Sequence, residues 1–357
     1  MPPSTRIPAL LQPYVQLPHD SILLLTSTLG ASANWLLIRF LCNELSTQDG
    51  GDEGHNVVLV SWMREYDFWK QEARKGAALD LDKLRKEGRF AFFDGLGAGG
   101  NAPDSTAERP SRTDAQATPR VPVSNATSQR GPQILPARGP PGRIVPARGP
   151  PPSAPAVAPA SSPATSAANS QATASQGTPG HYTLKSLEIA DIKSTISSAI
   201  SPLATSTARK TLLIFDNPDL LLALNPTITP SHFTTLMLQL HTLPNVSHIL
   251  THLQADNPLL SLSTPPQPLE VAHHNLVVKC AHMSRRILGV RVLDTGVARD
   301  VSGVIRITEQ RKQWFDVGFG IEANKDSDDS GRGKEFLYQV KSDGSVRVFE
   351  RGAGGEG

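Results

Sequence analysis

The chain has few of the features that mark secreted, membrane or strongly charged proteins. Its two cysteines, Cys42 and Cys280, lie far apart among 357 residues and form no CxxC pair, which favours a reducing compartment over a disulfide scaffold. No apolar run approaches the ~20 residues that cross a bilayer, and prolines interrupt the start where a signal peptide needs an apolar core. The net charge of +2 gives no global attraction for nucleic acid. We therefore expect a soluble, intracellular protein.

Aromatic residues are also scarce, and one long segment has none. Residues 97–180 hold 16 of the 30 prolines, with mostly Ala, Ser, Thr and Gly between them. Such a segment cannot bury enough surface to offset the entropy of ordering it. We predict a first domain part over 1–96, a disordered insert over 97–180, a second part of the same domain over 181–350 and a disordered tail over 351–357.

What the ordered parts contain is an alternation of short apolar runs and helical patterns. Apolar runs predict buried strands over residues 21–25, 57–61, 89–94, 210–216 and 246–253. Two final strands, 335–341 and 345–350, are joined by a good hairpin turn. The pattern predicts an α/β fold with a central, mostly parallel sheet, helices on both faces and an antiparallel C-terminal hairpin. Ligands in such sheets bind at the carboxyl ends of strands, which here are residues 26–32, Asp94, Asp216 and Gln254.

The stretch 21–41 has the strand, turn and helix of a phosphate-binding loop, G-x-x-x-x-G-K-[ST]. In that frame Gly30 is the second glycine and Ser32 the hydroxyl, while Leu25 replaces the first glycine and Ala31 the lysine. Ala31 cannot place a positive charge on the phosphates. We expect Leu25 and Ala31 at the bend between a central strand and its helix, with no catalytic residue and no bound cofactor. A functionless turn with one glycine is the simpler alternative.

Asp216 ends an apolar strand, where a nucleotide-binding fold places its magnesium-organising acid. It could equally cap a helix over residues 219–224, and the missing lysine favours the cap. His248 and His252 have the i, i+4 spacing of metal ligands only on a helix. On a strand they are ~13 Å apart, so we expect no metal site.

Three aromatic residues, Trp62, Tyr66 and Trp69, fall at helical spacing within residues 62–75. Such a stripe usually packs into the core. The alternative is a partner-facing patch, because interface centres are enriched in aromatic residues.

Four long segments together resemble the Elongator complex protein 6 family in its filamentous-fungal form. They are residues 24–41, 57–84, 89–96 and 284–308, and the resemblance extends over about 10–96 and 182–349. It implies a RecA-like ATPase fold that has lost a working phosphate-binding loop. Asp216 matches the second acidic motif, and Gln254 matches the position that senses the γ-phosphate in active relatives.

The resemblance also implies partners. Members of the family form a hexameric ring with Elongator complex proteins 4 and 5, two copies of each. The ring docks on the catalytic Elongator subcomplex, binds tRNA and supports wobble uridine modification in the cytoplasm and nucleus. This chain is then not an enzyme, since the chemistry lies in another subunit.

For tRNA contact, the densest basic run of the ordered chain supplies the candidates Arg285, Arg286, Arg291 and Arg299. The expected channel-facing loops, 217–225 and 255–268, contain no lysine or arginine, so phosphate neutralisation must come from elsewhere. Two other functions stay open: an independent NTPase that uses Ser32 and Asp216, and a DNA-repair mediator of the same fold.

Overall fold

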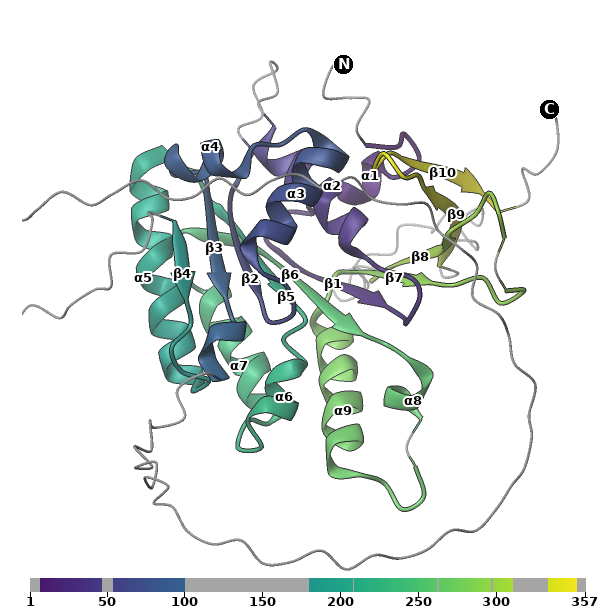
Figure 1. Ribbon diagram of the computed structural model, residues 1–357. Helices are drawn as coiled ribbons and strands as arrows, with labels where there is room; N and C mark the ends of the chain where they lie inside the picture. The colour runs from purple at the N-terminus through teal and green to yellow at the C-terminus, as the bar shows by residue number, and fades with distance from the viewer. Residues whose placement is uncertain are drawn as a thin grey trace, which may run out of the picture. The chain divides into compact units, whose positions relative to one another are not determined.

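A ten-stranded sheet is the centre of the computed structural model (Figure 1). The structure describes residues 7–46, 54–99, 180–207, 209–261, 263–296, 298–310 and 333–351. Its strand order is β10-β9-β8-β7-β1-β6-β5-β2-β3-β4. All pairings from β7 to β4 are parallel, and β8, β9 and β10 continue the sheet with antiparallel pairings.

The strands are β1 Ser21–Ser27, β2 Asn56–Ser61, β3 Phe90–Asp94, β4 His181–Thr183, β5 Thr211–Asp216, β6 Val246–Gln254, β7 Arg286–Arg291, β8 Gly303–Glu309, β9 Lys334–Val340 and β10 Val346–Glu350. The helices are α1 Gln12–Val15, α2 Asn34–Leu45, α3 Tyr66–Ala77, α4 Leu81–Lys86, α5 Ile189–Thr207, α6 Leu220–Leu224, α7 Pro230–His241, α8 Asn257–Leu260 and α9 Pro268–Met283, with a short 3-10 turn, η2, at Leu96–Gly99.

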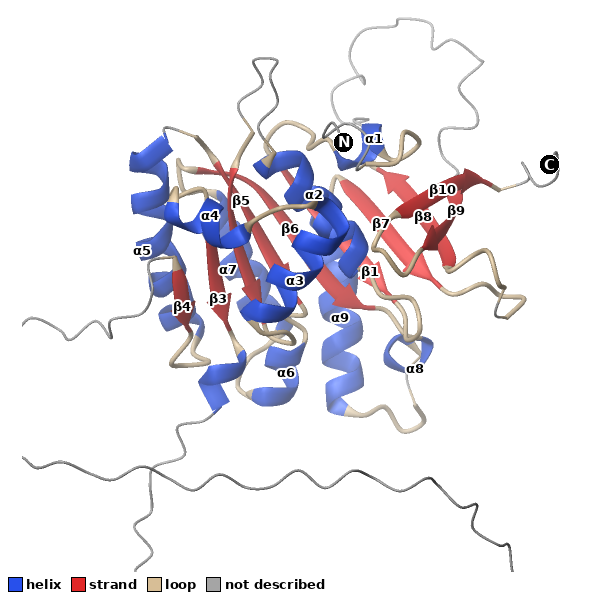
Figure 2. Ribbon diagram, turned by 45° about the horizontal axis from the view of Figure 1, so that its top comes forward, coloured by secondary structure: helices blue, strands red, loops and turns tan. Residues whose placement is uncertain are grey.

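Helices cover both faces of the parallel strands, which explains why those strands are apolar almost throughout (Figure 2). Alternate residues of β1, β2, β3, β5 and β6 contribute to two separate cores. Leu23 and Leu25 of β1 pack with α2, α3 and α4, whereas Ile22 and Leu24 pack on the side of α5, α7 and α9. Cys42 belongs to the first core and Cys280 to the second, and both thiols are free and buried.

Local sequence signals fix several element ends. Helix α7 begins with proline at its first position, and the hydroxyl of Thr229 accepts from the His232 backbone N–H at 3.3 Å. The β9–β10 turn places Gly344 at φ +79, a left-handed conformation that glycine adopts without strain. The hairpin is therefore formed as predicted.

The strand order is that of a RecA-like domain. Strand β1 lies between β6 and β7, and β5, with its terminal acid, lies on the far side of β6. The predicted α/β fold with a mostly parallel central sheet, helices on both faces and antiparallel C-terminal strands is confirmed. Strand β4 was not predicted, and the helix expected from Trp62 begins only at Tyr66. Most of the predicted insert and of the C-terminal tail lie outside the described residues. Within those that are described, no helix is both long and apolar enough to cross a membrane.

Candidate functional site

The turn between β1 and α2, residues 28–33, is closed by its own hydrogen bonds. The backbone N–H of Ala31 donates to the carbonyl of Thr28 at 2.9 Å, and Gly30 sits at φ +86. The N–H of Leu29 donates to Oδ1 of Asp256 at 2.5 Å. A carboxylate therefore occupies one of the N–H groups that a bound phosphate would use.

The expected place of Leu25 was wrong. Leu25 lies inside β1, paired with His252 and Leu288, and only Ala31 is in the bend. The reason is that Thr26 and Ser27, whose hydroxyls suggested a turn, continue the ladder with β6 and β7. The turn between β1 and α2 therefore begins only at residue 28, whereas the phosphate-binding frame would begin at residue 25.

The stretch that forms the turn and its flanking strand and helix supplies no free positive charge in place of the missing lysine. The stretch 21–41 contains no lysine, and its one arginine, Arg39, is buried. Arg39 donates to the backbone carbonyls of Gly76 at 2.6 Å and Gly344 at 2.9 Å. Ser32, the expected hydroxyl of the frame, accepts from the N–H of Asn34 at 3.3 Å.

Buried polar groups form a continuous chain at the carboxyl ends of β2, β5, β6 and β1. Ser61 donates to Oδ2 of Asp216 at 2.7 Å, and Nδ1 of His252 lies 2.8 Å from Oδ1 of the same carboxylate. Nε2 of His252 lies 2.8 Å from the Ser27 hydroxyl, which also donates to Gln254 Oε1 at 3.2 Å. We call these five residues the strand-end network.

Asp216 therefore does not cap helix α6, as the sequence suggested. The residue before α6 is Asp219, which makes no side-chain capping bond. Both oxygens of Asp216 are engaged, by Ser61 and by His252, at the position where a magnesium-organising acid would stand. Across the described ranges, no group of three or more His, Cys, Asp and Glu side chains could hold a metal ion.

Next to the network lies a second buried polar cluster. Asn217 has φ +55, and neither atom of its side-chain amide has a hydrogen-bond partner among the described residues. Burial raises the pKa of Asp219, while His273 and His252 oppose that shift. Nε2 of His273 lies 2.9 Å from the backbone carbonyl of Gln254. The cluster thus joins α9 to the end of β6.

Sequence reasoning identified Asp216, Gln254 and the strand-end stretch that contains Ser27, but it missed Ser61 and considered His252 only as a metal ligand. A signal for them exists in the sequence. Ser27 and Ser61 each end an apolar strand, and His252 is a polar residue within an apolar one. Parallel pairing of Ser61 with Asp216, and of Asp216 with His252, then sets these side chains on one face of the sheet.

The four arginines proposed to contact tRNA have different environments. Arg286 is buried and donates to the carbonyls of Tyr14 at 2.7 Å and Gln16 at 2.8 Å, with Glu309 as its ion-pair partner. Because its guanidinium is bonded within the protein, Arg286 is no longer a candidate for contact with tRNA.

The other three arginines reach the surface to different extents. Arg291 pairs with Asp294 at 2.5 Å and Glu335 at 3.5 Å, and these acids raise its pKa. Arg285 is half-buried and Arg299 is exposed. These two remain the freer candidates.

The three aromatic residues at helical spacing are all buried in the core, but they do not all pack on the same side of the sheet. Tyr66 and Trp69 pack in the core on the α2–α4 side. Trp62 lies before α3 and packs on the opposite side of the sheet, with its ring 6.0 Å from that of Phe215. The interpretation as core packing is confirmed, and the partner-facing alternative is wrong for these residues.

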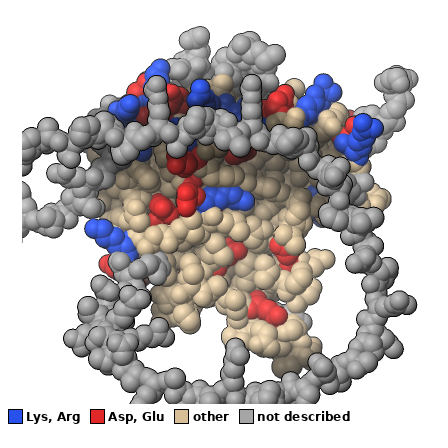
Figure 3. Space-filling view, viewed as in Figure 1, with Lys and Arg blue, Asp and Glu red and all other residues tan. Residues whose placement is uncertain are grey.

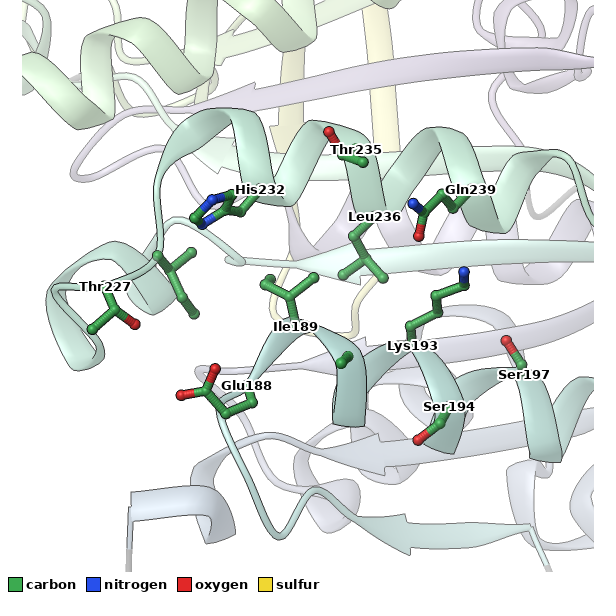
Figure 4. Close-up of a pocket in the computed structure, with 12 residues that line it drawn as sticks. Glu188, Ile189, Lys193, Ser194, Ser197, Thr227, His232, Thr235, Leu236 and Gln239 are labelled. Carbon is green, nitrogen blue, oxygen red and sulfur yellow. The ribbon is translucent and has the colours of Figure 1, made fainter.

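A groove of about 900 Å³ lies between α5 and α7, on the opposite side of the sheet from the strand-end network (Figure 4). Ile189, Ile228 and Leu236 supply apolar lining, and Lys193 and Glu188 are its charged residues. None of the residues predicted to form a site lines this groove.

Comparison with known proteins adds little to these observations. No family model and no curated protein matches the chain. Among solved structures, a KaiC-like protein from Pyrococcus horikoshii is similar, with a TM-score of 0.46 and 11% sequence identity over 97% of each chain. The assignment to the RecA-like class depends on the strand order described above.

Proposed function

We propose that this chain is a non-catalytic RecA-like subunit of the Elongator complex. It forms a hexameric ring with Elongator complex proteins 4 and 5, associates with the catalytic Elongator subcomplex, binds tRNA and supports wobble uridine modification in the cytoplasm and nucleus. The sequence resemblance over residues 10–96 and 182–349 supports this membership, and the RecA-like fold is compatible with it.

One observation carries the non-catalytic part of the proposal: the acid at the end of β5 and one N–H of the turn after β1 are already bonded within the protein. Asp216 is bonded to His252 and Ser61, and the Leu29 N–H is bonded to Asp256. A P-loop ATPase needs a lysine and a metal-organising acid that are free to meet phosphate and magnesium. The geometry here favours a scaffold role.

Co-purification tests the membership. The tagged chain, co-expressed with Elongator complex proteins 4 and 5, should elute with both at the mass of a six-subunit ring. Elution of the chain on its own would contradict the proposal.

The affinity of the purified ring for tRNA tests the proposal that the ring binds tRNA through this chain. Replacing Arg285 and Arg299 by alanine should weaken binding and reduce its dependence on salt, because each phosphate contact releases counterions. Unchanged binding at low salt would remove both residues from the tRNA site.

The alternative of an independent NTPase is tested on the purified chain without partners. Sustained ATP turnover by the wild-type chain would establish it and overturn the non-catalytic proposal.

A further inference from the structure

The groove between α5 and α7 is bordered by an unusually uncharged surface. Residues 220–255, which include α6, α7 and β6, contain no lysine, arginine, aspartate or glutamate. A surface helix normally carries charged residues on its solvent side, but α7 exposes Thr235, Leu238 and Gln239 there. In Figure 3 charged side chains gather over the upper part of the view, and most of the surface below them is uncharged. Depletion of charge is typical of the centre of an interface.

The groove combines apolar side chains with hydrogen-bond donors. Ile189 of α5 and Leu236 of α7 point toward each other across it, and Lys193 extends from α5 toward Gln239 of α7 (Figure 4). Glu188 supplies a carboxylate just before α5. Such a groove fits an extended chain that offers aliphatic side chains, free backbone carbonyls and a positive charge.

The chain itself contains a segment with these properties. Residues 134–141 and 144–151 repeat the pattern Ile-(Leu/Val)-Pro-Ala-Arg-Gly-Pro-Pro. Ile134, Leu135 and Ile144 are the only isoleucine and leucine residues between positions 97 and 180. Proline-rich segments leave their backbone carbonyls without internal hydrogen bonds, and each copy of the pattern contains one arginine. We call residues 134–151 the repeat segment.

The groove lies within reach of the repeat segment. Glu188 follows Gly180 by eight residues, so it lies no more than about 29 Å from the point where the described chain resumes. The 28 residues from 152 to 179 span up to about 90 Å. Before the insert, Gly97 packs beside Thr183, which precedes Glu188 by five residues. A tethered segment has an effective concentration in the millimolar range at a site that it can reach.

We propose that the repeat segment docks in the groove between α5 and α7 of the same chain. Its aliphatic side chains pack on Ile189 and Leu236, and an arginine pairs with Glu188. Either copy of the pattern fits the groove, so the second copy keeps it occupied when the first is released. This inference does not depend on membership of the Elongator complex, and it gives the insert a task within its own chain.

The test measures the affinity of the purified full-length chain for a fluorescent peptide with the sequence of residues 133–151. A repeat variant replaces with serine the four aliphatic residues of the repeat segment, Ile134, Leu135, Ile144 and Val145. In the wild type the tethered segment competes with the peptide, so the repeat variant should bind the peptide about tenfold more tightly or better. Serine in one copy alone should change the affinity by no more than about twofold. The matched control, Val121→Ser with Val123→Ser elsewhere in the insert, should bind like the wild type.

Two further measurements locate the site. Thr235→Arg places a bulky charge in the groove, whereas Leu238→Arg adds the same charge to α7 outside the groove lining. Within the repeat variant, Thr235→Arg should weaken peptide binding about tenfold or more, and Leu238→Arg should leave it unchanged. In the wild type without peptide, the amide hydrogens of residues 189–197 and 227–239 should exchange more slowly than in the repeat variant.

The contrary outcomes are distinct. The proposal is overturned if the repeat variant does not bind the peptide, if it binds no better than the wild type, or if hydrogen exchange is the same in both. Peptide binding that survives Thr235→Arg would place the segment outside the groove. A wild type that dimerises while the repeat variant stays monomeric would overturn docking within one chain, since the segment would then occupy a second copy. Circular dichroism of each variant confirms that the fold is retained.

Discussion

Replacing Asp216 with alanine should cost this protein stability. The carboxylate is wholly buried, and it bonds to the Ser61 hydroxyl at 2.7 Å and to Nδ1 of His252 at 2.8 Å. Its removal leaves both groups buried without that partner, at about 1–3 kcal/mol each. We therefore expect Asp216→Ala to lower the free energy of unfolding by roughly 4 kcal/mol. In an ATPase that holds magnesium with this acid, the same change would mainly abolish hydrolysis.

Urea unfolding, followed by tryptophan fluorescence, measures the effect, because the buried ring of Trp62 packs against Phe215 next to Asp216. Asp216→Asn should cost less, since the amide oxygen still accepts one of the two bonds. Asp300→Ala, at an exposed aspartate, should change stability by no more than about 0.5 kcal/mol. If Asp216→Ala also changed the free energy of unfolding by no more than about 0.5 kcal/mol, the structural role of the strand-end network would be refuted.

Three further substitutions have defined outcomes. Arg286→Leu removes two charge-assisted bonds to the backbone carbonyls of Tyr14 and Gln16, so it should destabilise the protein by about 3 kcal/mol in urea unfolding while tRNA affinity of the ring stays unchanged. Burial, together with His55, lowers the pKa of His248 to about 4. The folded state therefore binds fewer protons than the unfolded state between about pH 6.5 and pH 4, and stability falls by about 2.5 kcal/mol over that interval as the pH is lowered. His248→Gln should remove that part of the acid sensitivity, as unfolding at the two pH values would show. Gly30→Ala should cost about 1–2 kcal/mol in thermal unfolding, because φ is +86 and Val292 lies 3.2 Å from the added methyl carbon.

The fold could be predicted because it depends on patterns that are local in the sequence. Apolar runs of strand length, such as that of β5, are buried on both faces in almost any α/β arrangement. Proline at the start of α7 and glycine in the final hairpin act within a few residues. These signals do not require knowledge of the partners across the sheet.

The site could be predicted only in part, because its contacts join residues far apart in the chain. Ser27 and His252 are separated by 225 positions, and Leu29 and Asp256 by 227. A hydroxyl at a strand end looks like the start of a turn until the neighbouring strand is known. Arg286 looked like a surface charge for the same reason, since its acceptors lie about 270 residues away.

Equilibrium binding of Mg²⁺–ATP to the purified chain tests the central claim most directly. Because the carboxylates of Asp216 and Asp256 are bonded within the protein and the turn has no lysine, we predict no binding at millimolar nucleotide. Magnesium-dependent binding in the micromolar range would contradict the account.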